Sequence, residues 1–230
     1  KTLLTDQLAK LDQTAQNGQT PDFAGLTDGL AAEREQGITI DVAYRYFATP
    51  KRKFIIADTP GHEQYTRNMV TGASTADAAI ILIDATRVDF NGEEPALLPQ
   101  TKRHSAILKL LGTPHIIVAV NKLDLLGFDR AAYEKIVSAY RKLAAQISLN
   151  ADIRFIPISA LGGDNIVDPS ANTPWYQGEP LLPLLENLPA AQSKTEHQHA
   201  CLPVQRVARQ DGSSSDDFRG YQGRLEAGRL

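Results

Sequence analysis

The fold is indicated first by the stretch IIVAVNKLD, residues 116–124, in which an apolar run leads directly into polar Asn121. Three more apolar segments lead into a polar residue in the same way: residues 54–57 precede Asp58, residues 80–83 precede Asp84, and residues 153–158 precede Ser159. Strands whose apolar character is continuous rather than alternating are typical of a parallel sheet that is buried on both faces. The sequence therefore predicts such strands at these four places, each ending in a polar side chain.

Helices are expected between these strands, at residues 63–75, 101–111 and 130–147, where apolar residues recur at helical spacing. The alternation of strand and helix predicts an α/β fold with a doubly wound, mostly parallel sheet. Ligands of such sheets bind outside the carboxyl ends of the strands, which is where the polar side chains lie. Residues 38–47 alternate between apolar and polar and predict a further strand at an edge.

The composition is that of an ordinary globular protein and argues against several classes. The 230 residues carry 24 Lys and Arg against 27 Asp and Glu, so broad electrostatic binding to nucleic acid or to an anionic membrane is not expected. A single cysteine, Cys201, excludes an internal disulfide and a multi-cysteine zinc site, and it suits a reducing compartment. No apolar run approaches the roughly 18 to 20 residues of a membrane span. We therefore expect a soluble, cytoplasmic protein without a membrane or nucleic-acid partner.

Asn121-Lys122-Leu123-Asp124 directly after an apolar strand predicts recognition of guanine. The guanine edge offers a ring N–H and an amino group that one carboxylate, that of Asp124, can accept together, and adenine lacks this pair. Asn121 is expected to bond the base and tie the loop, and the stem of Lys122 to lie along the ring. Ser159-Ala160 is expected to offer a backbone N–H to guanine O6. The simpler alternatives are Asn121 as a turn former, Lys122 as a solvated charge and Ser159 as a helix cap.

Asp58-Thr59-Pro60-Gly61 fits the phosphate end of a nucleotide site. The Asp58 carboxylate can hold Mg²⁺ through water and the Gly61 backbone N–H can approach a γ-phosphate, although an ordinary turn has the same pattern. Thr39 is the candidate to ligate Mg²⁺ and contact the γ-phosphate when GTP orders its loop. These motifs call for a phosphate loop, G-x-x-x-x-G-K-[ST], which the sequence does not contain. Lys1-Thr2 could be its last two positions.

Two longer stretches carry a family resemblance: residues 33–69, which include EREQGITIDVAYRYF and KRKFIIADTPGHEQYTRNM, and Gly163-Asp164-Asn165 followed by Pro174-Trp175-Tyr176. They resemble translation-factor-type GTPases, which include elongation factors Tu and 1A, and within these the GTPase subunits of bacterial ATP sulfurylase. The resemblance covers essentially residues 1–230. Because KTLLTDQLAKL, residues 1–11, resembles a stretch that follows the phosphate loop in those subunits, Lys1 is expected to lie downstream of that loop. Residues 91–99 are expected to be an insertion, and 17–24 a shortened or divergent loop.

The resemblance implies a P-loop GTPase domain over residues 1–190, whose phosphate loop lies upstream. A linker over 191–201 and the beginning of a β-barrel domain over 202–230 are expected to follow. GTP or GDP and Mg²⁺ are the implied cofactors. His62 is implied to orient the hydrolytic water, with a capping or surface histidine as the alternative.

In the resembled enzyme, the GTPase subunit couples GTP hydrolysis to the formation of adenosine 5′-phosphosulfate from ATP and sulfate. The implied partner is a smaller adenylyltransferase subunit, and some members of the family carry a fused adenylylsulfate kinase domain. One alternative is an elongation factor 1A/Tu-type GTPase that delivers aminoacyl-tRNA. The other is a fragment that lacks a competent nucleotide site.

Overall fold

The computed structural model describes residues 38–92 and 95–189, which all belong to the first of two compact units of the chain, Lys1–Ala191. The predictions made for residues 1–37, for the linker and for the second domain, with Cys201, lie outside the described residues. In chain order the elements are β1 (Ala43–Ala48), β2 (Lys53–Asp58), η1 (Glu63–Tyr65), α4 (Thr66–Ala73), β3 (Ala78–Asp84), η2 (Ala85–Arg87), α5 (Pro99–Leu111), β4 (His115–Asn121), η3 (Leu123–Leu126), α6 (Arg130–Gln146), β5 (Asp152–Pro157) and α7 (Leu181–Asn187), where η marks a 3-10 helix.

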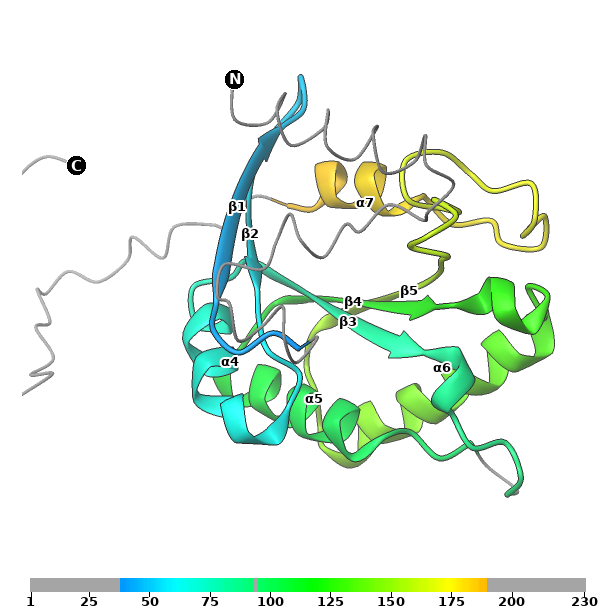
Figure 1. The fold of residues 1–230 in the computed structure, drawn as a ribbon, viewed down its shortest axis with the longest axis horizontal. Coiled ribbons are helices and arrows are strands. Elements are labelled where there is room, and N and C mark those ends of the chain that lie inside the picture. Colours follow the sequence, from blue (N-terminus) through cyan, green and yellow to red (C-terminus); the bar gives the residue numbers. More distant parts are fainter. Residues whose placement is uncertain (1–37, 93–94, 190–230) are drawn as a thin grey trace, which may run out of the picture. The chain divides into compact units, whose positions relative to one another are not determined.

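Strands β3, β4 and β5 form a parallel sheet in that order (Figure 1). The register places Asp84 opposite Asn121, and Val120 opposite Pro157. Parallel strands in this register bring their carboxyl ends to one edge, so the polar residues that follow the apolar runs become neighbours. The predicted parallel arrangement is confirmed for these three strands.

The central strand β4 is buried on both faces, and its residues 116–120 have no exposed surface. Ile116, Val118 and Val120 pack into a core with residues of α5 and α6, whereas Ile117 and Ala119 pack with Leu184 of α7. Figure 1 shows α5 and α6 on one side of the sheet and α7 on the other. Each buried branched side chain contributes about 1.5–3 kcal/mol. The doubly wound α/β fold is therefore confirmed, and it is anchored on β4.

Local interactions set the ends of helices α5 and α6. In α6 the side chain of Asp129 accepts hydrogen bonds from the backbone N–H groups of Ala131 and Ala132, which fixes the first turn. Helix α5 begins at Pro99, where a missing N–H costs nothing, and ends at Gly112 in the left-handed region at φ 69°. Among the described residues, no helix is long and apolar enough to cross a membrane.

Strands β1 and β2 pair antiparallel, and Phe47 stacks on Phe54 between them with ring centroids 4.6 Å apart. The edge strand predicted at 38–47 is confirmed only from Ala43 onward. The helix predicted at 63–75 is a 3-10 turn followed by α4. Helix α7 was not predicted, because its apolar residues surround Pro183, which a first helical turn tolerates.

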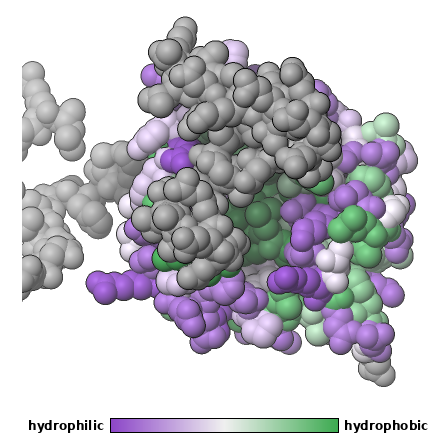
Figure 2. Space-filling model, in the orientation of Figure 1, coloured by the Kyte–Doolittle hydropathy of each residue, from purple (hydrophilic) through white to green (hydrophobic). Residues whose placement is uncertain are grey.

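The prediction that all four strands are buried on both faces is wrong for β2 and β3 within the described residues. Ile55 and Leu82 are 68% and 62% exposed, and Ile56 and Ile80 are also exposed. The physical reason is that β2 pairs only with β1, and β3 only with β4, among the described strands. Figure 2 shows hydrophobic surface at the centre of the view, in the region of β3 in Figure 1.

Candidate functional site

Asn121 joins two loops at the carboxyl edge of the parallel sheet. Its side-chain oxygen Oδ1 accepts hydrogen bonds from the backbone N–H of Lys122, at 2.8 Å, and from that of Ala160, at 3.0 Å. The backbones that lead into these two loops are also joined, because the N–H of Ile158 donates a hydrogen bond to the carbonyl of Val120 at 2.8 Å. Two segments of the predicted guanine site, 39 residues apart in sequence, are thus brought together.

Lys122 is held at its backbone and at its ammonium group. Its φ of 61° lies in the left-handed region, and its Nζ lies 2.8 Å from Oδ2 of Asp84. The other oxygen of Asp84 accepts from the backbone N–H and the hydroxyl of Thr86. Burial raises the pKa of Asp84, but the hydrogen bonds from Lys122 and Thr86 outweigh it and hold this pKa below its ordinary value. The alternative of Lys122 as a merely solvated charge is wrong.

Asp124 follows on the short helix η3, whose position is set by Leu123. Leu123 is fully buried in the core between Lys122, which is exposed, and Asp124, which is half-buried. The turn closes through a hydrogen bond from the N–H of Gly127 to the carbonyl of Asp124, and Gly127 has a φ of 61°. An apolar anchor between two accessible polar residues is what the Asn-Lys-x-Asp pattern requires.

Ser159 is buried, and its hydroxyl accepts the N–H of Gly162 at 3.1 Å. The alternative of Ser159 as a helix cap is therefore wrong, because its hydroxyl closes a turn and not a helix. Its carbonyl accepts the N–H of Gly163 at 2.8 Å, so both polar groups of Ser159 close the same loop. The predicted hydrogen bond to guanine O6 would therefore come from the backbone N–H of Ala160.

Asn165 fixes this loop from within, and sequence reasoning gave it no role. The residue is 1% exposed, and its Nδ2 donates to the carbonyl of Pro157 and to the hydroxyl of Thr173, both at 2.8 Å. Its Oδ1 accepts the N–H of Ser170 at 2.8 Å. The only sequence signal was the Gly-Asp-Asn triplet, which carried family resemblance but no physical function.

Of the residues predicted for the phosphate end, Asp58 and Gly61 lie on β2 and in the loop after it, whereas Thr39 precedes β1. Asp58 ends β2 and is half-buried, whereas Gly61 and His62 are exposed. A Cβ atom at Gly61 would meet nothing within 4 Å, so within the chain itself no contact demands glycine there. His62 stands at the N-cap of η1 without a capping bond from its side chain, so the capping alternative is wrong, whereas its exposure agrees with the alternative of a surface histidine.

Two features that were not predicted from the sequence connect this region to helix α4: a hydrogen bond and a close approach of the backbone. Asn68 Nδ2 donates to the carbonyl of Ile40 at 2.9 Å, which links the residue after Thr39 to the helix. A Cβ atom on Gly72 would lie 2.6 Å from Cγ2 of Thr59, so α4 approaches the loop after β2 as closely as glycine permits. A glycine inside a helix was the available sequence signal.

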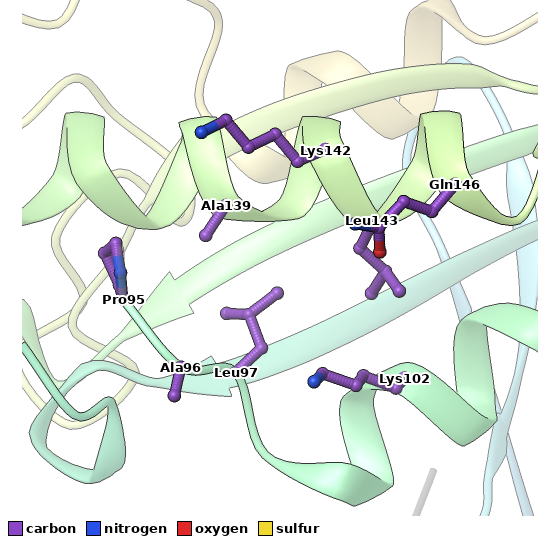
Figure 3. Close-up of a pocket in the computed structure, with 8 residues that line it drawn as sticks. All are labelled: Pro95, Ala96, Leu97, Lys102, Ala139, Lys142, Leu143 and Gln146. Atoms are coloured by element: carbon purple, nitrogen blue, oxygen red, sulfur yellow. The ribbon is translucent and has the colours of Figure 1, made fainter. Parts of the chain in front are cut away.

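Two cavities of the described part of the chain are lined by residues other than the predicted ones. One of about 130 Å³ lies between α5, α6 and the segment 95–97, and its lining includes Lys102 and Lys142 (Figure 3). Another of about 230 Å³ lies beside Gly112 and Leu149, near the amino end of β4. Both are smaller than the roughly 300–1,000 Å³ of typical ligand pockets.

No cluster of three or more metal-ligating His, Cys, Asp or Glu side chains occurs in residues 38–92 and 95–189. Thr39 and Asp58 offer one hydroxyl and one carboxylate, which are hard oxygen ligands. Mg²⁺ is commonly held by one or two protein ligands together with substrate phosphates and waters, so this donor set fits it.

A parallel sheet with helices on both faces and polar motifs at its carboxyl edge defines the chain as an α/β domain of the P-loop GTPase fold. The chain belongs to the family of the elongation factor Tu GTP binding domain, whose sequence model matches residues 1–192. Among solved structures, the S. cerevisiae Ski7 GTPase-like domain, bound to GDP and inorganic phosphate, is similar with a TM-score of 0.59 at 19% identity, over 77% of this chain and 42% of that one. That likeness concerns the fold.

Curated relatives place the chain more narrowly. It is 55% identical over 227 residues to sulfate adenylyltransferase subunit 1 of Tolumonas auensis, covering 97% of this chain and 45% of that protein. It is 52% identical to the same subunit of Photobacterium profundum, with the same coverage. It is 54% identical over 237 residues to the bifunctional enzyme NodQ of Rhizobium meliloti, covering 100% of this chain and 34% of that enzyme. The chain thus spans less than half the length of these relatives.

Proposed function

We propose that this domain binds and hydrolyses GTP as the GTPase part of a sulfate adenylyltransferase. The observation that carries the nucleotide assignment is the double hydrogen bond of Asn121 Oδ1 to Lys122 and Ala160. It assembles, at the ligand-binding edge of the sheet, the two loops in which guanine-recognising residues were predicted. The family match supports the same assignment.

The base contacts are divided among these loops. Asp124 accepts the ring N–H and the amino group of guanine in a charge-assisted pair, which adenine cannot supply. The stem of Lys122 lies against the ring. Because the N–H of Ala160 already donates to Asn121, its contact to guanine O6 is a shared, three-centre hydrogen bond.

The phosphates lie toward β2. Thr39, and Asp58 through water, would hold Mg²⁺, which would supply neutralisation of phosphate charge. The Gly61 N–H donates to the γ-phosphate, and the open space at this glycine leaves room for that approach. Among the described strands, β2 pairs only with β1 and β3 only with β4, so each has an edge at which a further strand can pair.

Hydrolysis requires a water that is aligned with the γ-phosphate. His62 is exposed and adjoins Gly61, so its imidazole positions this water without acting as a strong base. Glu63, the next residue, forms an ion pair with Arg103 of α5 at 2.9 Å. This pair links the first residue of η1 to α5.

For the whole protein, we propose coupling of GTP turnover to formation of adenosine 5′-phosphosulfate from ATP and sulfate, in the cytoplasm and with a smaller adenylyltransferase subunit. The names of the sulfate adenylyltransferase relatives support this proposal over aminoacyl-tRNA delivery. The likeness to the bifunctional enzyme NodQ keeps a fused adenylylsulfate kinase domain open. The domain limits of 1–190, 191–201 and 202–230 remain part of the same proposal.

The base assignment is tested by Asp124→Asn in the full-length gene product, with nucleotide binding measured calorimetrically. We expect GDP affinity to fall by about 100-fold, since a charge-assisted pair is lost, and affinity for xanthosine diphosphate to rise. Asp168→Asn, the same chemical change at an exposed loop position, is the matched control and should bind GDP as the unaltered protein does. Unchanged GDP preference in Asp124→Asn would contradict the assignment.

The assignment of the whole protein is tested by its partners. A small adenylyltransferase subunit should co-purify with the full-length gene product and yield GTP-dependent ATP sulfurylase activity. Tight binding of aminoacyl-tRNA without that activity would favour the translation-factor alternative.

A further inference from the structure

Asp84 and Lys122 meet across two neighbouring strands. The register places Asp84, the last residue of β3, opposite Asn121, the last residue of β4, so Lys122 is the first residue beyond the paired ends. Its Nζ reaches back 2.8 Å to Asp84 Oδ2. The side chain of Lys122 therefore runs along the carboxyl edge of the sheet toward β3.

The Asp84 carboxylate is a fixed anchor for this lysine. Its Oδ1 accepts the backbone N–H of Thr86 at 3.0 Å and the Thr86 hydroxyl at 2.6 Å, and thereby caps η2. Arg87 Nε lies 3.8 Å from Oδ2. The Asp84 side chain is 20% exposed and the Lys122 side chain 50%, so the acid is the more sheltered partner of the pair.

We propose that Asp84 is a positioning residue for Lys122, holding the lysine stem as a preformed apolar shelf for the guanine ring. The inference rests on the proposed nucleotide function. A free lysine side chain samples many rotamers, and much of this freedom is lost when the chain is immobilised against a ligand. With the backbone of Lys122 bonded to Asn121 and its ammonium to Asp84, that ordering precedes binding.

A purely structural role for Asp84, as the cap of η2, predicts different behaviour. A cap affects the stability of its own turn, and this effect does not depend on the residue at position 122. A positioning residue acts only through the lysine, so its effect on nucleotide binding vanishes once the lysine charge is removed. Asp84→Asn keeps an oxygen acceptor for Thr86 and removes the charge that holds Lys122, which separates the two roles.

The experiment is a double-mutant cycle of Asp84→Asn and Lys122→Met in the full-length gene product, with GDP affinity measured by fluorescence of a labelled nucleotide. Methionine keeps an unbranched apolar stem without the ammonium. We expect Asp84→Asn to weaken GDP binding by about three- to tenfold, the value of ordering one long side chain. The double variant should then bind no more weakly than Lys122→Met alone. Thr86→Ala, which removes only the hydroxyl bond to Asp84, should stay within about twofold of the unaltered protein.

Losses that multiply in the double variant, or an Asp84→Asn protein with unchanged GDP affinity, would overturn the positioning role while leaving the proposed function intact. An unaltered protein that binds no GDP would overturn the proposed function, and this inference with it. Circular dichroism and thermal unfolding of each variant establish that the compared proteins are folded.

Discussion

Replacing Asn165 by alanine tests how firmly the loop that carries Ala160 is held. The substitution removes three hydrogen bonds from a residue that is 1% exposed, and it leaves the Pro157 carbonyl and the Ser170 N–H without their partners. At about 1 kcal/mol for each bond, the loss is about 3 kcal/mol. Asn165 has a φ of 56°, where alanine costs about 1 kcal/mol more. The local free energy of opening should therefore fall by about 4 kcal/mol.

Hydrogen–deuterium exchange of the full-length gene product measures this opening locally. A change of about 4 kcal/mol corresponds to an approximately thousandfold faster exchange of protected amides in residues 157–176, provided that the loop opens as a unit. Protection in α6 should remain nearly unchanged. Asn172→Ala, which removes one exposed bond to Asp164, is the matched control and should accelerate exchange less than about fivefold. A change below fivefold in Asn165→Ala would refute the reasoning.

Three further predictions concern other parts of the domain. His62→Ala should slow GTP hydrolysis by about 100-fold or more in single-turnover assays and change GTP affinity little; a large loss of affinity would show a structural histidine. Gly72→Ala should slow hydrolysis by displacing Thr59, and Thr59→Ser, which removes the crowded methyl, should restore it; failure of this rescue would contradict the steric account. Burial and the nearby Glu179 raise the pKa of Tyr176 to about 12, so the stabilisation by its neutral hydroxyl is complete below about pH 10 and lost as the pH rises toward 12. Tyr176→Phe should be about 1 kcal/mol less stable in urea at pH 8 and should lose less stability above pH 10, and equal pH profiles for the two proteins would contradict this.

The strands and helices around β4 were predictable because their signals are local. Continuous apolar runs mark β3, β4 and β5 at 80–83, 116–120 and 153–158, and helical periodicity marks α6. The segment 38–42 misled the prediction because its apolar residues alternate as in a strand, although no described strand pairs with it. Exposure of Ile55 and Leu82 was not predictable, because the burial of a strand depends on which neighbours the whole sheet supplies and not on the strand's own composition.

The residues of the candidate site were likewise predictable only where the signal was local. Asn121, Lys122 and Asp124 were predicted because three polar residues at fixed spacing directly after a strand leave few other interpretations. The pairing of Asp84 with Lys122 was not predicted, since it depends on the register between β3 and β4 across 38 residues of sequence. Asn165 was missed for a related reason: its amide has partners only after the loop from Ser159 has closed around it.

These two missed residues act on the guanine half of the site from opposite sides. Asp84 holds Lys122 from β3, whereas Asn165 holds the Ala160 loop through the end of β5. Asn121, on the strand between them, accepts hydrogen bonds from both loops on its single side-chain oxygen atom. Because Asp84 and Asn121 end paired strands of one sheet and Asn165 bonds the last residue of β5, the register of the sheet sets the proposed position of the base. The phosphate end, on β2 and the loop after it, lacks such a shared frame among the described strands, so a nucleotide that bridges the two sheets would couple them.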